Sequence, residues 1–256
     1  MNHQKGCNSA VILAAGKSSR FYGEPTLTRH KSTEAIIKTQ IDKLNIKNEK
    51  FNNTILGNLI NILLISGVNR IIIVVNDILN FDFVKEPRIE LISNPEFSNK
   101  SSSGSVALGL KKLSKSDCTL VIDGDLYFSN TSFENVYAYL NGNNFLVTPH
   151  TSSGDECVAT FNNGEFFEFT KNIKEVEKTG HPEFLGISHL SPNFITKFLA
   201  VAEETSFTEP YEKLFPIIAK MGEPVGFLYS STFKWKDLDN IEDIKIIRKL
   251  QQNENV

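Results

Sequence analysis

The sequence predicts an α/β fold in which a mainly parallel, Rossmann-like sheet is flanked by helices and joined by a smaller antiparallel lobe. Between residues 10 and 125, short apolar runs alternate with segments of helical spacing, which is typical of a parallel sheet. After Pro149, strand-like runs lie on either side of Asn162–Gly164, a turn signal typical of an antiparallel hairpin. The chain has 256 residues, enough for one large domain with an ample core.

Each element follows from a local pattern. Ala10 to Leu13 is a short apolar run, so we expect a buried strand there. Arg70–Val75 is continuously β-branched after its first residue, as in buried parallel strands. The same reasoning predicts strands over 89–92, 119–122, 157–161, 165–170 and 184–188, and helices over 54–67, from 101–105 to about 113, over 192–203 and over 210–221. Asn240 is expected to cap a last helix, with Asp243 in its first turn.

Composition excludes several classes of protein. A net charge of −3 gives no reason to expect a nucleic acid or a membrane surface as a partner. Cys7, Cys118 and Cys157 are an odd number without a CxxC pair, so we expect reduced thiols and a cytoplasmic location. Residues 1–8 lack the apolar stretch of a signal peptide, and the apolar run from Ile55 to Val68 is too short and too interrupted to span a bilayer.

The segment that follows the first strand has the composition of a phosphate-binding loop. Small residues at 14–16 allow close approach of the backbone to a ligand, and free N–H groups before a helix start form an anion site. Arg20 adds a forked, permanently charged donor for phosphate. Two common phosphate loops are excluded, because Val11 stands where a P-loop requires its first Gly and Gly16 stands alone where the dinucleotide motif requires three.

A second polar group follows the strand over 119–122. Asp123 and Asp125 stand at its carboxyl end, where ligands bind in open α/β sheets. Carboxylates are the ligands of hard ions such as Mg²⁺, which also take phosphate oxygens. The alternative is a simple Asp-Gly turn.

Residues 13–20, Leu-Ala-Ala-Gly-x-Ser-x-Arg, resemble the opening motif of nucleotidyltransferases with a glycosyltransferase-A-like fold. The resemblance implies that Asp125 is a metal ligand in the motif Val-Ile-Asp-Gly-Asp. The Asn-Pro…Ser segment is similar to the one that lines the family's nucleotide pocket, although simple helix capping explains its serines equally well. The nucleotide-binding residues implied are Leu13, Ala14, Ala15, Gly16, Ser18, Ser19, Asn94, Ser105 and Asp123.

The family's phosphate lysine has two candidates here. Members usually carry Pro-Lys shortly after the Arg, and this sequence has none. Lys31 has suitable spacing, with His30 in place of the Pro, whereas Lys43 precedes a stretch like the family's next strand and helix. We favour Lys31. The alternative is that both are solvated surface charges.

The last part of the chain implies the remaining site residues. Trp235–Asp239 resembles the segment that returns to the family's active site with further metal ligands, and Asp237 and Asp239, two apart, share one face of an extended strand. Asp155–Val158, Lys171 and Phe184–Ser188 resemble segments of phosphocholine-cytidylyltransferase-like members. They imply the acceptor-binding residues Asp155, Glu156, Lys171, Phe184, Tyr211 and Glu212. A choline-like ammonium also requires an aromatic wall, for which Phe184, Tyr211 and Trp235 are candidates, although core packing is the favoured role for any one of them.

The resemblance implies nucleotidyl transfer: an NTP, expected to be CTP, condenses with phosphocholine or a related amino-alcohol phosphate or phosphonate, and pyrophosphate leaves. We expect one domain over 1–256, with a nucleotide-binding part (9–148), a mostly acceptor-binding part (149–235) and a returning segment with a C-terminal helix (236–256). Arg20 and the lysine act in catalysis, with Mg²⁺ on Asp125, Asp237 and Asp239. The alternatives are a sugar 1-phosphate acceptor, a glycosyltransferase of the same fold, and a nucleotide-sensing domain without catalysis.

Overall fold

The computed structural model describes residues 7–16, 18–22, 31, 53–78, 86–113, 118–151, 156–162, 165–171 and 180–253. The first half contains β1 (Ser9–Ala14), α1 (Ser19–Tyr22), α3 (Ile55–Ile65), β2 (Arg70–Val75), β3 (Ile89–Ser93), α4 (Ser102–Lys112), β4 (Thr119–Asp123) and β5 (Leu126–Phe128). The second half contains α5 (Asn130–Tyr137), β6 (Asn144–Thr148), β7 (Val158–Asn162), β8 (Glu165–Thr170), β9 (Glu183–Leu190), α7 (Pro192–Glu204), the 3₁₀ helix η3 (Tyr211–Leu214), α8 (Phe215–Lys220), β10 (Gly226–Tyr229), β11 (Trp235–Asp237) and α9 (Asp243–Asn253).

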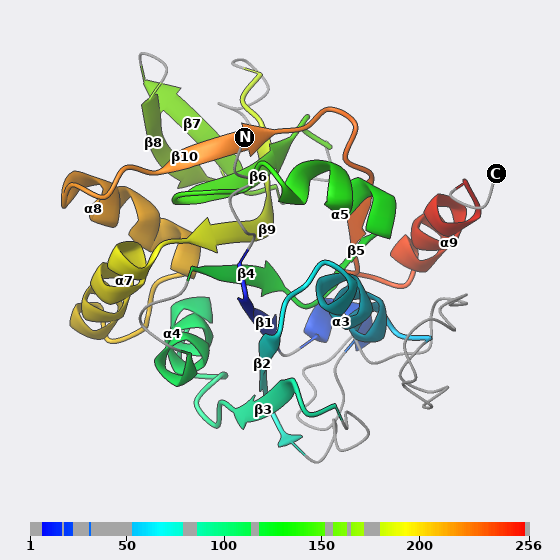
Figure 1. The fold of residues 1–256 in the computed structure, drawn as a ribbon, viewed down its shortest axis with the longest axis horizontal. Coiled ribbons are helices and arrows are strands. Elements are labelled where there is room, and N and C mark those ends of the chain that lie inside the picture. Colours follow the sequence, from blue (N-terminus) through cyan, green and yellow to red (C-terminus); the bar gives the residue numbers. More distant parts are fainter. Residues whose placement is uncertain are drawn as a thin grey trace.

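The central sheet has the strand order β10-β6-β9-β4-β1-β2-β3, which runs from top to bottom in Figure 1. β1 pairs in parallel with both β2 and β4, and β2 pairs in parallel with β3. β9 runs antiparallel to its neighbours β4 and β6, and β7 and β8 form an antiparallel hairpin beside it. A separate two-stranded sheet joins β11 to β5. The predicted α/β class, with a mainly parallel sheet and a small antiparallel part, is confirmed.

Helices cover both faces of this sheet (Figure 1). Alternate side chains of a strand point to opposite faces, so Ile12 and Ile73 pack in the core under α3 and α5, whereas Val11 and Val74 pack in the core under α4, α7 and α8. The strands β1 and β2, which are apolar after their first residues, therefore lie in the middle of the molecule, and only their ends can carry polar function.

Two expectations about helices have different outcomes. The cap of α9 is confirmed: Asn240 Oδ1 accepts from the backbone N–H of Asp243 at 3.3 Å, and Asp243 Oδ2 accepts from that of Asn240 at 2.8 Å, a reciprocal capping box. The single helix expected over 210–221 is wrong. It is divided into η3 and α8, and Pro216 stands in the first turn of α8, where its missing N–H is tolerated.

In the part of the chain that the structure describes, no helix has the length and apolarity needed to cross a membrane.

Candidate active site

The candidate site lies where β1 and β4 end. The two strands are parallel neighbours with Leu13 opposite Asp123, so the loop after β1 and the turn after β4 meet at one edge of the sheet. The backbone N–H of Gly124 donates to Leu13 O at 2.9 Å. A Cβ at position 124 would stand 2.6 Å from that same oxygen, so the close approach of the two segments requires glycine between the two aspartates.

A cavity of about 340 Å³, here called the first cavity, opens at this edge. Backbone and short hydroxyl side chains make up much of its wall, and the N-terminus of α4 faces it. Its lining consists of Leu13, Ala15, Gly16, Ser18, Arg20, Phe21, Lys31, Phe97, Lys100, Ser101, Ser102, Ser105, Asp123, Asp125 and Asp239. Phe97, Lys100, Ser101 and Ser102 lie within the Asn-Pro…Ser segment that the resemblance placed at the nucleotide pocket, although none of the four was assigned individually.

Two residues assigned to nucleotide binding lie behind the first cavity rather than in its lining. Ala14 is completely buried in the core. Asn94 is 2% exposed, and its Nδ2 donates to Ser105 Oγ at 2.9 Å, so its contact with the cavity is through Ser105. The side chain of Ser19, together with Lys43 and Asp155, lies outside the described residues.

Four charged side chains in the lining of the first cavity form an ionic cluster. Lys31 Nζ lies 2.8 Å from Asp125 Oδ2 and 3.0 Å from Asp239 Oδ1. Arg20 Nη2 lies 2.8 Å from the same Asp239 oxygen. Burial alone would lower the pKa of Lys31, but Asp125 and Asp239 outweigh it and the pKa is raised. Burial alone would raise the pKa of Asp239, but chiefly Lys31 reverses the effect and the pKa is lowered. Lys31 and Asp239 are therefore both ionised around neutral pH.

Asp237 adds a third carboxylate beside this cluster. Burial raises its pKa above the ordinary value, and the nearby charges of Asp239 and Asp125 add to this effect. Oxygens of Asp125 and Asp239 already converge on one positive charge, the ammonium of Lys31. Three neighbouring carboxylates are a suitable donor set for a hard divalent ion, so the residues fit the predicted metal.

A second cavity, of about 170 Å³, adjoins the first and shares Arg20, Asp123, Asp125 and Asp239 with it. Carboxyl groups and aromatic rings dominate the rest of its lining. The residues are Leu126, Glu156, Cys157, Lys171, Glu183, Phe184, Leu185, Gly186, Tyr211, Glu212, Trp235 and Asp237. All the described residues that were assigned to the acceptor are among them. Burial raises the pKa of Glu183 and of Glu212, and for Glu212 Lys171 and Lys213 offset part of that rise.

Asp123 stands between the two cavities and is held closely. Its enclosed position, with Asp125 and Glu212 nearby, raises its pKa well above the ordinary value. Tyr211 donates its O–H to Asp123 Oδ1 at 3.4 Å. On the other side, a Cβ at Gly186 would stand 2.3 Å from Asp123 Oδ2, and φ at Gly186 is +78°. Both the space and the backbone angle at position 186 therefore require glycine.

Comparisons with known proteins agree with this geometry. The model of the MobA-like NTP transferase domain matches residues 10–252. No curated protein sequence matches significantly. The structure is similar to an inositol-1-phosphate CTP transferase from T. maritima, with a TM-score of 0.69, 15% identity and coverage of 97% of this chain and 98% of that one.

Two other solved structures are similar. One is a proposed glucose-1-phosphate thymidylyltransferase from Bacillus anthracis in complex with a sucrose, with a TM-score of 0.73, 15% identity and coverage of 96% and 95%. The other is a CTP:phosphocholine cytidylyltransferase from Streptococcus pneumoniae, with a TM-score of 0.66, 17% identity and coverage of 95% and 98%. At these identities the likeness establishes the shared fold.

Proposed function

The chain belongs to the MobA-like NTP transferase family and is a nucleotidyltransferase for an NTP and a phosphate-bearing acceptor, and we propose that the acceptor carries a positively charged amino group. Phosphocholine, a related amino-alcohol phosphate and an aminoalkyl phosphonate are the compounds of this class. For the nucleotide we propose CTP, which is supported by the motif resemblance and by two structural neighbours whose names specify CTP.

The lining of the second cavity carries this proposal. Glu156, Glu183 and Glu212 lie in it, each less than 9% exposed, together with the rings of Phe184, Tyr211 and Trp235. A nearby positive charge stabilises buried carboxylates in their ionised form, and aromatic faces attract ammonium groups. Lys171 lines the same cavity and supplies part of that charge beside Glu212. A cationic acceptor would add further positive charge beside the three carboxylates, whereas an uncharged sugar ring would add none.

The polar ends of this wall are held in place. Trp235 Nε1 donates to Thr148 Oγ1 at 3.1 Å, and Glu183 Oε2 accepts from the backbone N–H of Thr151 at 2.9 Å. The aromatic and acidic surfaces are therefore fixed before an acceptor arrives, which reduces the entropic cost of binding.

The reaction requires no general base on the protein. An acceptor phosphate has its second pKa near ~6 and is largely a dianion at neutral pH. Its oxygen attacks the α-phosphorus of the NTP, the new P–O bond forms, and the bond to the bridging β-phosphate oxygen breaks to release pyrophosphate. Lys31 and Arg20 line the first cavity, where they would bind phosphate oxygens and stabilise the charge that develops on pyrophosphate.

Members of this family generally use a divalent metal ion, and we propose Mg²⁺ held by Asp125, Asp237 and Asp239. When bound, such an ion neutralises charge on the phosphates. The orientation of the substrates comes from the chain itself: the loop after β1 and the N-terminus of α4 on the nucleotide side, and the acidic aromatic wall on the acceptor side.

A pyrophosphate-release assay with CTP, UTP, GTP and ATP against phosphocholine, aminoethylphosphonate and several sugar 1-phosphates tests the proposal. The matched control is dimethylbutyl phosphate, in which a carbon atom replaces the ammonium nitrogen of phosphocholine. We expect CTP with phosphocholine or aminoethylphosphonate to react best, and the neutral analogue to show a KM at least about ten-fold higher.

Equal use of the neutral analogue, or preference for a sugar 1-phosphate, would contradict the cationic acceptor. Preference for UTP or a purine nucleotide would contradict CTP and leave the reaction class unchanged. Nucleotide binding without any pyrophosphate release would favour the sensing domain.

A further inference from the structure

A second group of reactive side chains lies at the opposite end of the sheet from the active site. Cys7 precedes β1 and Cys118 immediately precedes β4, so both stand at the amino ends of strands whose carboxyl ends form the first cavity. His189 is near the end of β9, which runs antiparallel to β4 with Leu120 opposite His189. The adjacent order β9-β4-β1 therefore brings the three residues together.

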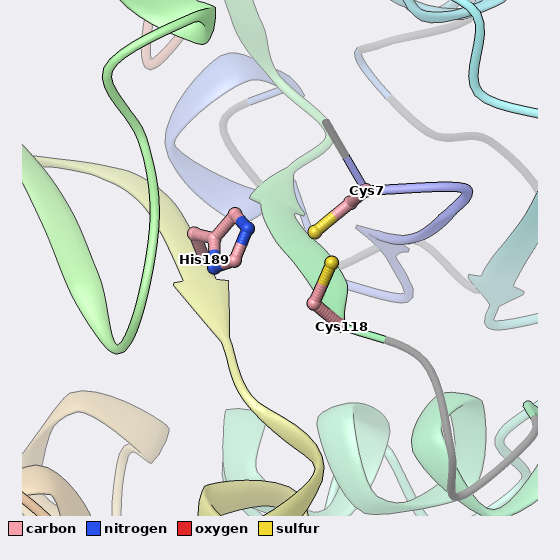
Figure 2. A group of neighbouring side chains, drawn as sticks. All are labelled: Cys7, Cys118 and His189. Carbon is pink, nitrogen blue, oxygen red and sulfur yellow. The ribbon is translucent and has the colours of Figure 1, made fainter. Parts of the chain in front are cut away.

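The side chains converge on one point. A sulfur atom from each cysteine and a ring nitrogen of His189 all lie within 4.8 Å of one another. Figure 2 shows the two sulfur atoms directed toward each other and a ring nitrogen of His189 on the side that faces them. The cysteines are not joined by a disulfide.

The backbone around the group selects the tautomer of the imidazole. His189 Nδ1 lies 2.9 Å from Gly142 O. A carbonyl oxygen only accepts hydrogen bonds, so Nδ1 carries the proton and the neutral ring keeps a lone pair on Nε2. Protein metal sites use the same arrangement, in which a carbonyl fixes the ring and the other nitrogen binds the ion.

Burial and access also suit an ion. Cys7 is 1% exposed and His189 is 6% exposed, whereas Cys118 is half-buried, so the group can be reached from the side of Cys118. Tyr137 donates its O–H to Cys7 O at 2.9 Å and fixes the backbone of that residue. Metals bind the thiolate form of cysteine, so binding would release the thiol protons.

We propose that Cys7, Cys118 and His189 bind one Zn²⁺ ion at the amino ends of β1 and β4. Two thiolates and an imidazole are ligands that Zn²⁺ prefers, and water or another small ligand can complete a tetrahedral site. Mg²⁺, which takes oxygen ligands, is excluded by the same donor set. The bound ion would tie the segment before β1 to β4 and β9 without touching either cavity.

Equilibrium dialysis of the reduced full-length chain, stripped with a chelator, tests the site. Excess Mg²⁺ is present so that the carboxylates of the active site do not take up Zn²⁺. We expect one equivalent of Zn²⁺ to bind, and binding to weaken at least ten-fold in both Cys118→Ser and His189→Ala. Cys157→Ser is the matched control, because Cys157 lines the second cavity, and it should keep the full equivalent.

Replacement by Co²⁺ gives an independent readout that also separates the two sites. A thiolate-to-cobalt charge-transfer band should appear in the wild type and disappear in Cys118→Ser, whereas carboxylate ligands alone give no such band. Zn²⁺ should also raise the melting temperature of the wild type and of Cys157→Ser, but not that of Cys118→Ser. Absence of stoichiometric Zn²⁺, or equal binding by Cys118→Ser, would overturn the proposal. If His189→Ala does not fold, Cys118→Ser, which changes one atom at a half-buried position, decides the question.

Discussion

The first and second cavities meet at Asp123, Asp125 and Asp239, and beyond these shared aspartates their linings have different chemistry. The first cavity offers backbone, serine hydroxyls and the cations Lys31 and Lys100, which suit a polyanion. The second offers carboxylates and aromatic rings, which suit a cation. Under the proposed function, the shared aspartates thus lie between a pocket for the nucleotide and a pocket for the positively charged amino group of the acceptor.

The two linings also differ in how the chain supplies them. Most residues of the first cavity come from two continuous stretches, 13–21 and 97–105. Those that belong to the second cavity alone come from separate segments between 126 and 237. Under the proposed function, the nucleotide is bound mainly by two short stretches of sequence, whereas the choice of acceptor depends on residues that only the fold brings together.

The largest effect on turnover is expected at Asp125, which lines both cavities. Asp125→Asn keeps the shape of the side chain but removes the charge that balances Lys31 and fits the metal, so turnover should fall by roughly 10³-fold. Pyrophosphate release measured over a range of Mg²⁺ concentrations checks this. An unchanged rate with unchanged metal dependence would show that Asp125 is not a metal ligand.

The next effect concerns the lysine of the first cavity. Lys31→Ala should lower turnover roughly 100-fold, because a fixed positive charge in the lining of the first cavity is lost. Lys43→Ala is the comparison variant and should have a much smaller effect. If steady-state rates fall in the reverse order, the phosphate lysine is Lys43.

A smaller effect should separate the two cavities. Glu212 lines only the second cavity and Ser105 only the first. Glu212→Gln should raise the KM of a cationic acceptor about ten-fold and leave the KM of the NTP unchanged. Ser105→Ala should raise the KM of the NTP about ten-fold and leave the KM of the acceptor unchanged. Equal changes in both constants in either variant would mean that the two cavities are not independent binding sites.

The smallest effect, on stability, is expected at Asp243, which lies next to Asp239. Asp243 caps α9 and also accepts from the backbone N–H of Asp239 at 2.9 Å, so Asp243→Ala should reduce the free energy of unfolding by about 1 kcal/mol. Glu242→Ala, at an exposed neighbouring position, is the control and should change it little. Denaturant titration of both variants measures the difference, and equal stabilities would contradict the capping role.

Local sequence patterns were sufficient to predict the strands at the centre of the sheet and insufficient to predict those at its edges. The β-branched run of β2 and the motif after β1 can each be interpreted without any other part of the chain. β10 cannot, because Gly226–Tyr229 is four residues long and becomes a strand only by pairing with β6. The resemblance places the Asn-Pro…Ser segment at the nucleotide pocket but does not select Lys100 or Phe97 within it, since their positions depend on where α4 packs.

The same limit applies to the cysteines. From sequence they are expected to be unrelated reduced thiols, and Cys7 and Cys118 are far apart in the chain. The pairing of β1 with β4, and of β4 with β9, is what brings them to His189. Long-range register of this kind has no local signature that a single sequence can reveal.

The reversed direction of β9 has a consequence for how such enzymes can diversify. Because β9 runs against β4, Glu183 and Phe184 reach the second cavity from the beginning of a strand, whereas Asp123 reaches it from the end of one. Under the proposed function, recognition of the acceptor and binding of the nucleotide thus depend on different stretches of chain. A chimera that exchanges residues 156–190 with those of a relative should acquire the relative's acceptor preference and keep its own nucleotide.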